Sequence, residues 1–490
     1  MNRFKTFALL FTLLITSLSA VLYAQSDGSK KFNALLQIIN YTYVDSTNED
    51  KLVEHAIVSV LKELDPHSVY IPKKELNKMN EPLVGNFDGV GIQFNILHDT
   101  LMVVSPISGG PSEKVGLQAG DKIIEVDGEN IAGIGIQNSD VQKKLRGERG
   151  TKVTVKIKRR NNSSLLAFTI TRDKIPIYSV DASYMATPAI GYIKVSRFAK
   201  NTSAEFKKAL TSLKSKNMKH LILDLRGNGG GYLKTAIQLA DEFIEERKLI
   251  VYTEGLKSPK QEYYTVSEGG FEAGKLVVLI DESSASASEI FAGAMQDYQR
   301  AIIVGSDSYG KGTVQSVLPL EHGQLKLTQA KFYRVSGDST QHQGVIPDIL
   351  FPSLFDKEKI GESALDEALA WDTIRPAGYK AKKDFQQWLP VLREKHQDRI
   401  ESNPDFVYLN NQKELMTDLR ARTDITLNEK QRKQEREDNE KQRLEIENKR
   451  RKAKGMELLE ALQTEEELLA EAEQAEKDKA DNQEDRDRAQ

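Results

Sequence analysis

Buried strands alternate with helices between about residues 185 and 352, and this alternation constrains the fold more than any other feature of the sequence. Residues 219–225 (KHLILDL) and 275–280 (KLVVLI) are continuous apolar runs, which is typical of strands that are covered on both faces. A helical pattern follows each run, at residues 232–244 and 289–298. Repeated strand and helix pairs of this kind predict an α/β domain with a layered sheet.

The regions on either side of this domain have a different texture. Residues 30–65 carry apolar side chains at helical spacing, which predicts two helices. From 85 to 172 short apolar runs are separated by glycine turns, which predicts a compact β-rich module. After Pro352 the chain is polar and mostly helical in pattern. Residues 428–443 contain no apolar side chain, so they have no coiled-coil seam and are expected to form a solvated single helix or to be disordered.

The first 24 residues resemble an export signal. Arg3 and Lys5 precede a stretch rich in leucine, phenylalanine and alanine. Ala20 and Ala24 offer small residues for cleavage, although leucine stands two positions before each of them. The alternative is an uncleaved anchor in the membrane, for which the stretch is just long enough. Either reading places the remainder of the chain outside the cytoplasm.

Composition excludes several classes of function. With 490 residues the chain exceeds what one hydrophobic core usually serves, so several domains are expected. The 69 basic and 72 acidic residues give a net charge of −3, which provides no electrostatic argument for binding nucleic acid or anionic lipid. The absence of cysteine excludes disulfides, thiolate catalysis and cysteine-ligated metals. The seven histidines show no HExxH spacing, so neither a metal nor another cofactor is expected.

A glycine-rich junction follows the first buried strand. Residues 224–231 (DLRGNGGG) lie between that strand and a helix, where backbone N–H groups can converge on an anion. The segment lacks the Gly-Lys-Ser/Thr ending of a phosphate loop and the G-x-G-x-x-G pattern of a dinucleotide loop. An oxyanion site is therefore favoured over a nucleotide site, and a plain tight turn remains the simpler alternative.

A serine run and a lysine between glycines complete the set. In residues 283–289 (SSASASE), a hydroxyl at a helix N-terminus would have free N–H groups beside it, although a simple helix cap would look the same. In residues 309–315 (YGKGTVQ), Lys311 could act as a general base if burial lowers its pKa. An ordinary surface lysine in a turn is the alternative. A Ser-His hydrolase that uses His322 or His342 also stays open.

Together these segments resemble the tail-specific, or carboxy-terminal processing, serine proteases, including their Prc-type members. The resemblance rests on SASASEIFAGAMQDYQRAIIVG, YGKGTVQ and KFYRVSGDSTQHQGVIPDI. It implies that Ser286 is the nucleophile, that Lys311 is its base and that Gln315 orients the lysine. By the same analogy, the backbone N–H groups of Gly230 and Ala287 would hold the oxyanion.

The β-rich module carries a second resemblance, to PDZ domains. Gly89, Val90, Gly91 and Ile92 precede a strand in the manner of a carboxylate-binding loop, and SPISGGPSEKVGLQAGDKIIEVDGENI is similar to the rest of that fold. Backbone amides there would bind a terminal carboxylate while the peptide adds as an edge strand. The arginine of the family's LRG motif falls on Arg146, which is expected to couple tail binding to the active site.

The expected organisation is an α/β multidomain protein. Its segments are a signal peptide at 1–24, a helical segment at 30–80, a PDZ domain at 85–172, an α/β serine protease core at 173–355, a C-terminal helical domain at 356–476 and a disordered tail at 477–490.

The expected function is that of a periplasmic endopeptidase for exported proteins with apolar C-terminal tails. An adaptor protein on the C-terminal helices and a homo-oligomer are possible partners. The rival from another class is a non-catalytic PDZ scaffold or chaperone.

Overall fold

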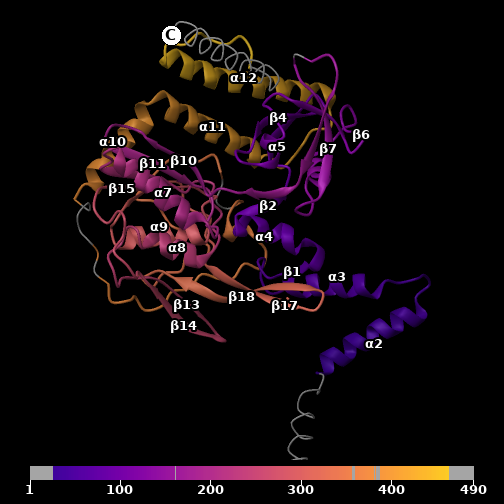
Figure 1. Ribbon diagram of the computed structural model, residues 1–490. Helices are drawn as coiled ribbons and strands as arrows, with labels where there is room; N and C mark the ends of the chain where they lie inside the picture. Colours follow the sequence, from indigo (N-terminus) through magenta and orange to yellow (C-terminus); the bar gives the residue numbers. More distant parts are fainter. Residues whose placement is uncertain (1–25, 161, 356–358, 380, 382–386, 463–490) are drawn as a thin grey trace, which may run out of the picture.

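The computed structural model describes residues 26–462 except 161, 356–358, 380 and 382–386. The segment expected to be a signal peptide and the tail at 477–490 lie outside the described residues. Figure 1 shows two sheets of one domain, a separate β-rich domain, and helices at both ends of the chain.

A six-stranded sheet forms the centre of the largest domain, in the order β10-β11-β12-β15-β16-β19. The neighbouring strands from β11 to β19 are parallel, whereas β10 is antiparallel to β11. The continuous apolar runs predicted as strands lie here. One face of β12 and β15 is fully buried in the core, whereas the side chains of the other face are only partly buried. The strands are β10 (Val180–Met185), β11 (Ile190–Val195), β12 (His220–Asp224), β15 (Leu276–Ile280), β16 (Ile302–Gly305) and β19 (Ile349–Leu350).

Helices pack on this sheet and separate it from a second one. They are α7 (Thr202–Ser215), α8 (Leu233–Ala240) and α9 (Ala287–Asp297). In Figure 1, α8 and α9 lie between the six-stranded sheet and the second sheet, and α9 contacts both. A single core cluster extends through these layers, so the strand and helix pattern is confirmed as an α/β layered domain.

The second sheet is antiparallel and joins distant parts of the chain. Its order is β1-β18-β13-β14, and β17 pairs with β18 as a hairpin. The strand β1 comes from the N-terminal segment, and its Val69 lies opposite Lys326 of β18. The strands are β1 (Val69–Pro72), β13 (Leu249–Gly255), β14 (Ser258–Tyr264), β17 (Thr313–Leu320) and β18 (Gly323–Tyr333).

The β-rich domain has its own sheet and its own hydrophobic core. The sheet order is β3-β4-β5-β7-β8, so β3 is an edge strand. A ribbon of β2 (Asn86–Gly89) and β9 (Asp173–Pro176) connects the domain to the α/β domain. The other elements are β3 (Ile92–Leu97), β4 (Thr100–Pro106), α5 (Pro111–Lys114), β5 (Lys122–Val126), β6 (Glu129–Asn130), α6 (Asn138–Leu145), β7 (Lys152–Lys158) and β8 (Leu166–Thr171).

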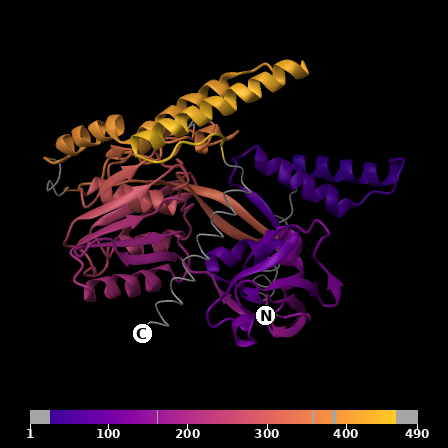
Figure 2. The ribbon, with the colours of Figure 1, turned by 90° about the horizontal axis from the view of Figure 1, so that it is seen from above.

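Helices make up most of both ends of the described chain. In Figure 2, α2 and α3 project from the body, while α11 and α12 pack against each other on the outside of the molecule. The segment at 428–443 is helical and lies almost entirely within α12. Asn428 caps this helix, since its side chain accepts the N–H of Gln431 at 3.1 Å. The elements are α2 (Asp27–Thr42), α3 (Glu49–Lys62), η1 (Lys73–Glu75), α4 (Leu76–Val84), η2 (Glu362–Ala364), α10 (Leu389–Ser402), α11 (Pro404–Ala421) and α12 (Glu429–Ala453). Within the described ranges, none of the helices combines the length and apolar character needed to cross a bilayer.

Candidate active site

A cleft of about 1270 Å³ opens beside the N-terminus of α9. The five residues predicted for catalysis and for the oxyanion all line it, although they come from three separate segments of the chain. They are Gly230, Ser286, Ala287, Lys311 and Gln315. Tertiary folding therefore brings the three sequence segments to one place.

Ser286 occupies the N-cap position of α9 in an unusual backbone conformation. Its φ is 54° and its ψ is −107°, a region that a residue with a Cβ rarely adopts. The neighbouring serines are buried and face the glycine loop: Ser284 Oγ donates to the carbonyl of Leu225 at 2.9 Å, and Ser288 Oγ donates to that of Asn228 at 2.8 Å. Of the serines in this run, Ser286 is the one that lines the cleft.

Lys311 lies in the loop before β17 and is partly buried. Burial lowers the pKa of Lys311 to about 8, and the positive charge of Lys326 acts in the same direction. The glycines on either side have no space for a side chain, since a Cβ at Gly310 would lie 2.8 Å from the carbonyl oxygen of His342. Within the described residues, no hydrogen bond joins the Lys311 amine to the Ser286 hydroxyl.

Glu289 connects the two loops, and the sequence analysis did not assign it a role. Its carboxylate is fully buried in the first turn of α9. One oxygen, Oε2, accepts the N–H of Ser286 at 2.6 Å and that of Lys311 at 3.0 Å. The other, Oε1, accepts from the Ser308 hydroxyl at 2.6 Å and from the Gly310 N–H at 2.7 Å. The glutamate three residues after an N-cap serine was a signal for this contact within the helix.

Burial disfavours the charged form of the Glu289 carboxyl group. It raises the pKa of Glu289 to about 7, although the four hydrogen bonds act in the opposite direction. All four donors are uncharged backbone or hydroxyl groups. The Glu289 carboxylate therefore fixes the relative positions of the Ser286 turn and the Lys311 loop without a positively charged partner.

The glycine loop packs directly on the turn that carries Ser286. Gly230 has φ of 98°, and a Cβ there would lie 2.7 Å from the carbonyl oxygen of Ala285 and 3.0 Å from the Cβ of Ser286. The Ala287 N–H, at the first position of α9, has no carbonyl within the helix to bind. The Gly230 N–H donates to the side-chain oxygen of Asn228 at 2.9 Å. Both N–H groups predicted to bind the oxyanion therefore lie beside Ser286, and that of Gly230 is already hydrogen-bonded to Asn228.

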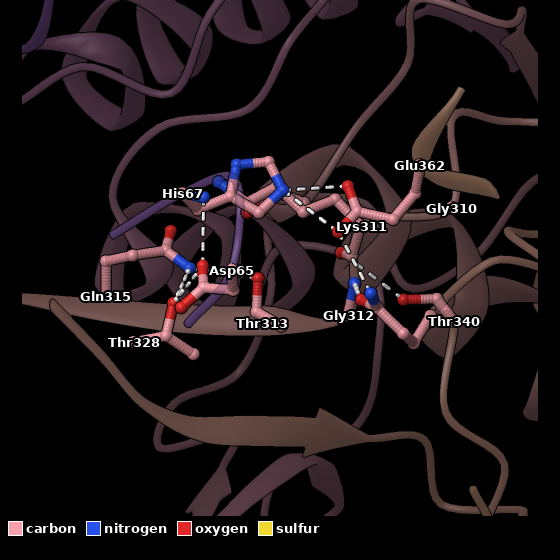
Figure 3. Close-up of polar contacts among 12 residues, drawn as sticks. Asp65, His67, Gly310, Lys311, Gly312, Thr313, Gln315, Thr328, Thr340 and Glu362 are labelled. Carbon is pink, nitrogen blue, oxygen red and sulfur yellow. Dashed lines mark hydrogen bonds and ion pairs between the residues drawn. The ribbon is translucent and has the colours of Figure 1, made fainter. Parts of the chain in front are cut away.

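Gln315 points its amide toward hydroxyl groups rather than toward the lysine amine. Its Nε2 donates to Thr313 at 2.9 Å and to Thr328 at 3.1 Å, and the Thr328 hydroxyl donates to Asp65 at 2.9 Å. Figure 3 shows this chain of contacts beside His67. The sequence segments around the lysine gave no indication that Asp65 would stand here.

The two histidines of the Ser-His alternative do not line the cleft. The carbonyl of His322 accepts the hydroxyl of Tyr70 in the turn between β17 and β18. His342 Nε2 is buried and has no hydrogen-bond partner among the described residues. The arrangement therefore favours Lys311 over either histidine as the group beside Ser286.

A second candidate site lies in the β-rich domain. The four residues expected to bind a carboxylate run from the end of β2 to the start of β3, which is an edge strand and open to pairing. Gly91 has φ of 76°, so glycine suits the turn. Arg146 follows α6, stacks over Phe87 at 4.4 Å from the ring centre and forms an ion pair with Glu81 of α4. Arg146 thus contacts the segment that connects the two domains.

Comparisons with known proteins agree with this architecture. Residues 189–351 match peptidase family S41, residues 355–490 match the C-terminal domain of tail-specific proteases, and residues 102–159 match the PDZ domain. The fold and site thus define a PDZ-containing peptidase of the serine type.

Individual relatives make the assignment more specific. The chain is 33% identical over 453 residues to the tail-specific protease of Haemophilus influenzae, a match that covers 88% of this chain and 64% of that protein. It is 37% identical over 326 residues to the carboxy-terminal-processing protease of Bartonella bacilliformis, covering 65% of this chain and 74% of that protein. Among solved structures, a photosystem II D1 C-terminal processing protease aligns with 26% identity and a TM-score of 0.40, over 70% of this chain and 99% of that one. The chain belongs to peptidase family S41, the carboxy-terminal processing proteases.

Proposed function

We propose that the protein is a serine endopeptidase in which Ser286 and Lys311 form a catalytic dyad and the PDZ domain selects substrates by their C-terminal tails. The observation that carries this proposal is the shared carboxylate of Glu289, which binds the backbone of both residues at 2.6 and 3.0 Å. The lowering of the Lys311 pKa to about 8 supports it further, because a base must be partly neutral near physiological pH.

The proposed reaction begins when the Lys311 amine takes the proton of the Ser286 hydroxyl as its oxygen attacks a peptide carbonyl. The N–H of Ala287 would stabilise the oxyanion, and that of Gly230 would join it by sharing or leaving Asn228. The lysine ammonium then protonates the leaving amine, and water hydrolyses the acyl-enzyme. Since no hydrogen bond joins the amine and the hydroxyl in the described structure, substrate binding must bring them together. In that arrangement Gln315 would orient the amine.

Six segments carry the proposed roles. These are an export signal at 1–24, an N-terminal helical segment at 30–80, a tail-binding domain at 85–172, the catalytic core at 173–355, a helical domain at 356–476 and a tail at 477–490.

We further propose that the enzyme acts in the periplasm. The apolar N-terminal stretch supports export, and the relatives named above are bacterial proteins. Its substrates would then be exported proteins with apolar C-termini, bound along β3 with the carboxylate near Gly91.

The test uses one reporter protein with either an apolar or a charged C-terminus. Wild type should cut the apolar form faster, whereas Ser286→Ala and Lys311→Ala should leave both forms intact. Ser283→Ala, a change at an exposed serine in the same turn, is the matched control and should keep wild-type activity. Cleavage by Lys311→Ala at the wild-type rate would refute the dyad.

A binding assay separates this proposal from the scaffold alternative. A scaffold would bind apolar tails equally with and without Ser286 and would form no adduct with a covalent serine probe. Detection of an adduct on Ser286 by mass spectrometry would exclude the scaffold.

A further inference from the structure

A buried polar cluster near the proposed base joins a residue from the N-terminal part of the chain to two segments that follow β18. His67 comes from the loop before β1, Gln341 follows β18, and Glu362 begins η2. The His67 Nε2 atom lies 2.9 and 2.8 Å from the two carboxylate oxygens of Glu362, and Gln341 Nε2 donates to Oε1 at 2.9 Å. Figure 3 shows the imidazole pointing at this carboxylate, which is fully buried.

The cluster holds the loop that carries Lys311 on both sides. The Glu362 N–H donates to the carbonyl of Tyr309 at 3.0 Å. The side-chain oxygen of Gln341 accepts the N–H of Gly312 at 2.8 Å. Glu362 therefore restrains the lysine loop on both sides: its backbone N–H binds Tyr309, and its carboxylate holds Gln341, which in turn binds Gly312.

Burying a carboxylate is costly unless it is paired and hydrogen-bonded. His67 and Gln341 provide these partners, and a hydrophobic residue would fill the same space without that cost. Packing alone therefore does not explain why a buried carboxylate, that of Glu362, lies beside the lysine loop.

We propose that Glu362, supported by His67 and Gln341, is a positioning residue for Lys311 that fixes its loop and supplies negative charge toward its amine. The inference rests on the proposed dyad. It makes segments on both sides of the catalytic core part of the active site.

Four charged groups act on the Lys311 amine, from four different elements. Lys326 of β18 lowers the pKa of Lys311, whereas Glu362 of η2, Glu289 of α9 and Asp65 before β1 raise it. His67 faces the Glu362 carboxylate and adds no negative charge of its own. Removing the charge of Glu362 should therefore lower the pKa of the lysine and extend activity to lower pH.

The experiment measures kcat and KM from pH 5.5 to 10 for the full-length wild type and for Glu362→Gln. The glutamine keeps the shape of the side chain and removes its charge. We expect the midpoint of the acid limb to move down by about 0.5–1 pH unit. The matched control is Glu242→Gln, which removes another buried glutamate that pairs with Lys207 and accepts the Gly270 N–H at 3.0 Å. This control should leave the midpoint in place.

An unchanged midpoint in a folded Glu362→Gln protein, with only a lower amplitude, would overturn the electrostatic part of the proposal. Gln341→Ala tests the other part, and it does so even if Glu362→Gln fails to fold. It breaks the contact to Gly312 and keeps the charge of Glu362, so kcat should fall about tenfold with KM and the midpoint unchanged. A wild-type kcat would overturn the positioning role.

Ser286→Ala in the same assay separates the two levels of inference. If it still cleaves the reporter, the proposed function fails. If it is inactive while the Glu362 and Gln341 variants behave like wild type, only the further inference fails.

Discussion

Replacing Lys326 by methionine tests whether the wall of the cleft sets the protonation of the proposed base. With a pKa of about 8, roughly one Lys311 amine in eleven is neutral at pH 7, against about one in three thousand at the ordinary value of 10.5. Burial is the largest cause of this difference, and the positive charge of Lys326 acts in the same direction. Methionine keeps much of the apolar stem of Lys326 and removes only the charge.

The direction of the effect follows from like-charge repulsion. Without Lys326 the charged form of Lys311 is less disfavoured, so its pKa rises. A rise of about one pH unit would reduce the neutral fraction about tenfold at pH 7 and would have little effect near pH 10.

The assay is the rate of Ser286 acylation by a covalent serine probe, measured by mass spectrometry between pH 6 and 10. Wild type should show a midpoint near 8, and Lys326→Met a higher one. Lys234→Met is the control, because this exposed lysine also lines the cleft but is not among the charges that act on Lys311. Equal midpoints for wild type and Lys326→Met, or a wild-type rate that does not change with pH, would refute the reasoning.

Four further predictions follow from single contacts. Glu289→Ala leaves buried N–H groups unpaired, so we expect at least a tenfold lower kcat and a loss of about 1–3 kcal/mol in unfolding free energy; a wild-type kcat with normal melting would contradict the role of the carboxylate. Gly230→Ala places a Cβ 2.7 Å from a carbonyl oxygen, so acylation of Ser286 should be largely lost, and a normal acylation rate would show that the loop can move aside. Lys311→Met should be more stable than wild type by up to about 3 kcal/mol at pH 7, because the folded protein holds this amine at a pKa below the unfolded value. That advantage should decrease as the pH rises from 8 to 10.5, and denaturant titrations with no such decrease would contradict it. Gly91→Val should raise KM for a tailed reporter and leave hydrolysis of a short untailed peptide unchanged, whereas equal effects on both substrates would argue against tail binding in this loop.

Local pattern was sufficient for the class of fold and for several elements. The apolar run at 219–225 contains β12 (His220–Asp224), and the run at 275–280 contains β15 (Leu276–Ile280). Both predictions are correct because the apolar character of a strand and the turns beside it can be read from consecutive residues. The junctions that contain Ser286 and Lys311 could also be found from local sequence. Each is a short motif, one between β15 and α9 and the other between β16 and β17.

Contacts between distant segments were not predictable in this way. The pairing of β1 with β18 and the contact of His67 with Glu362 join residues more than 200 positions apart. Neither segment carries a local signal for the other, because such contacts depend on how the layers pack. Glu289 is an intermediate case, since its contact with Ser286 is a helix-capping pattern, while its contact with Lys311 exists only in the folded chain.

The sequence alone therefore determined which side chains could perform the chemistry and which type of domain carries them. Tertiary structure decided their environment: the burial that lowers the pKa of Lys311, the carboxylate shared with Ser286 and the charges of Asp65 and Glu362 from either side of the catalytic core. The physical reason is that residue identity sets the available chemistry, whereas solvation and electrostatic interactions depend on neighbours that only folding brings together.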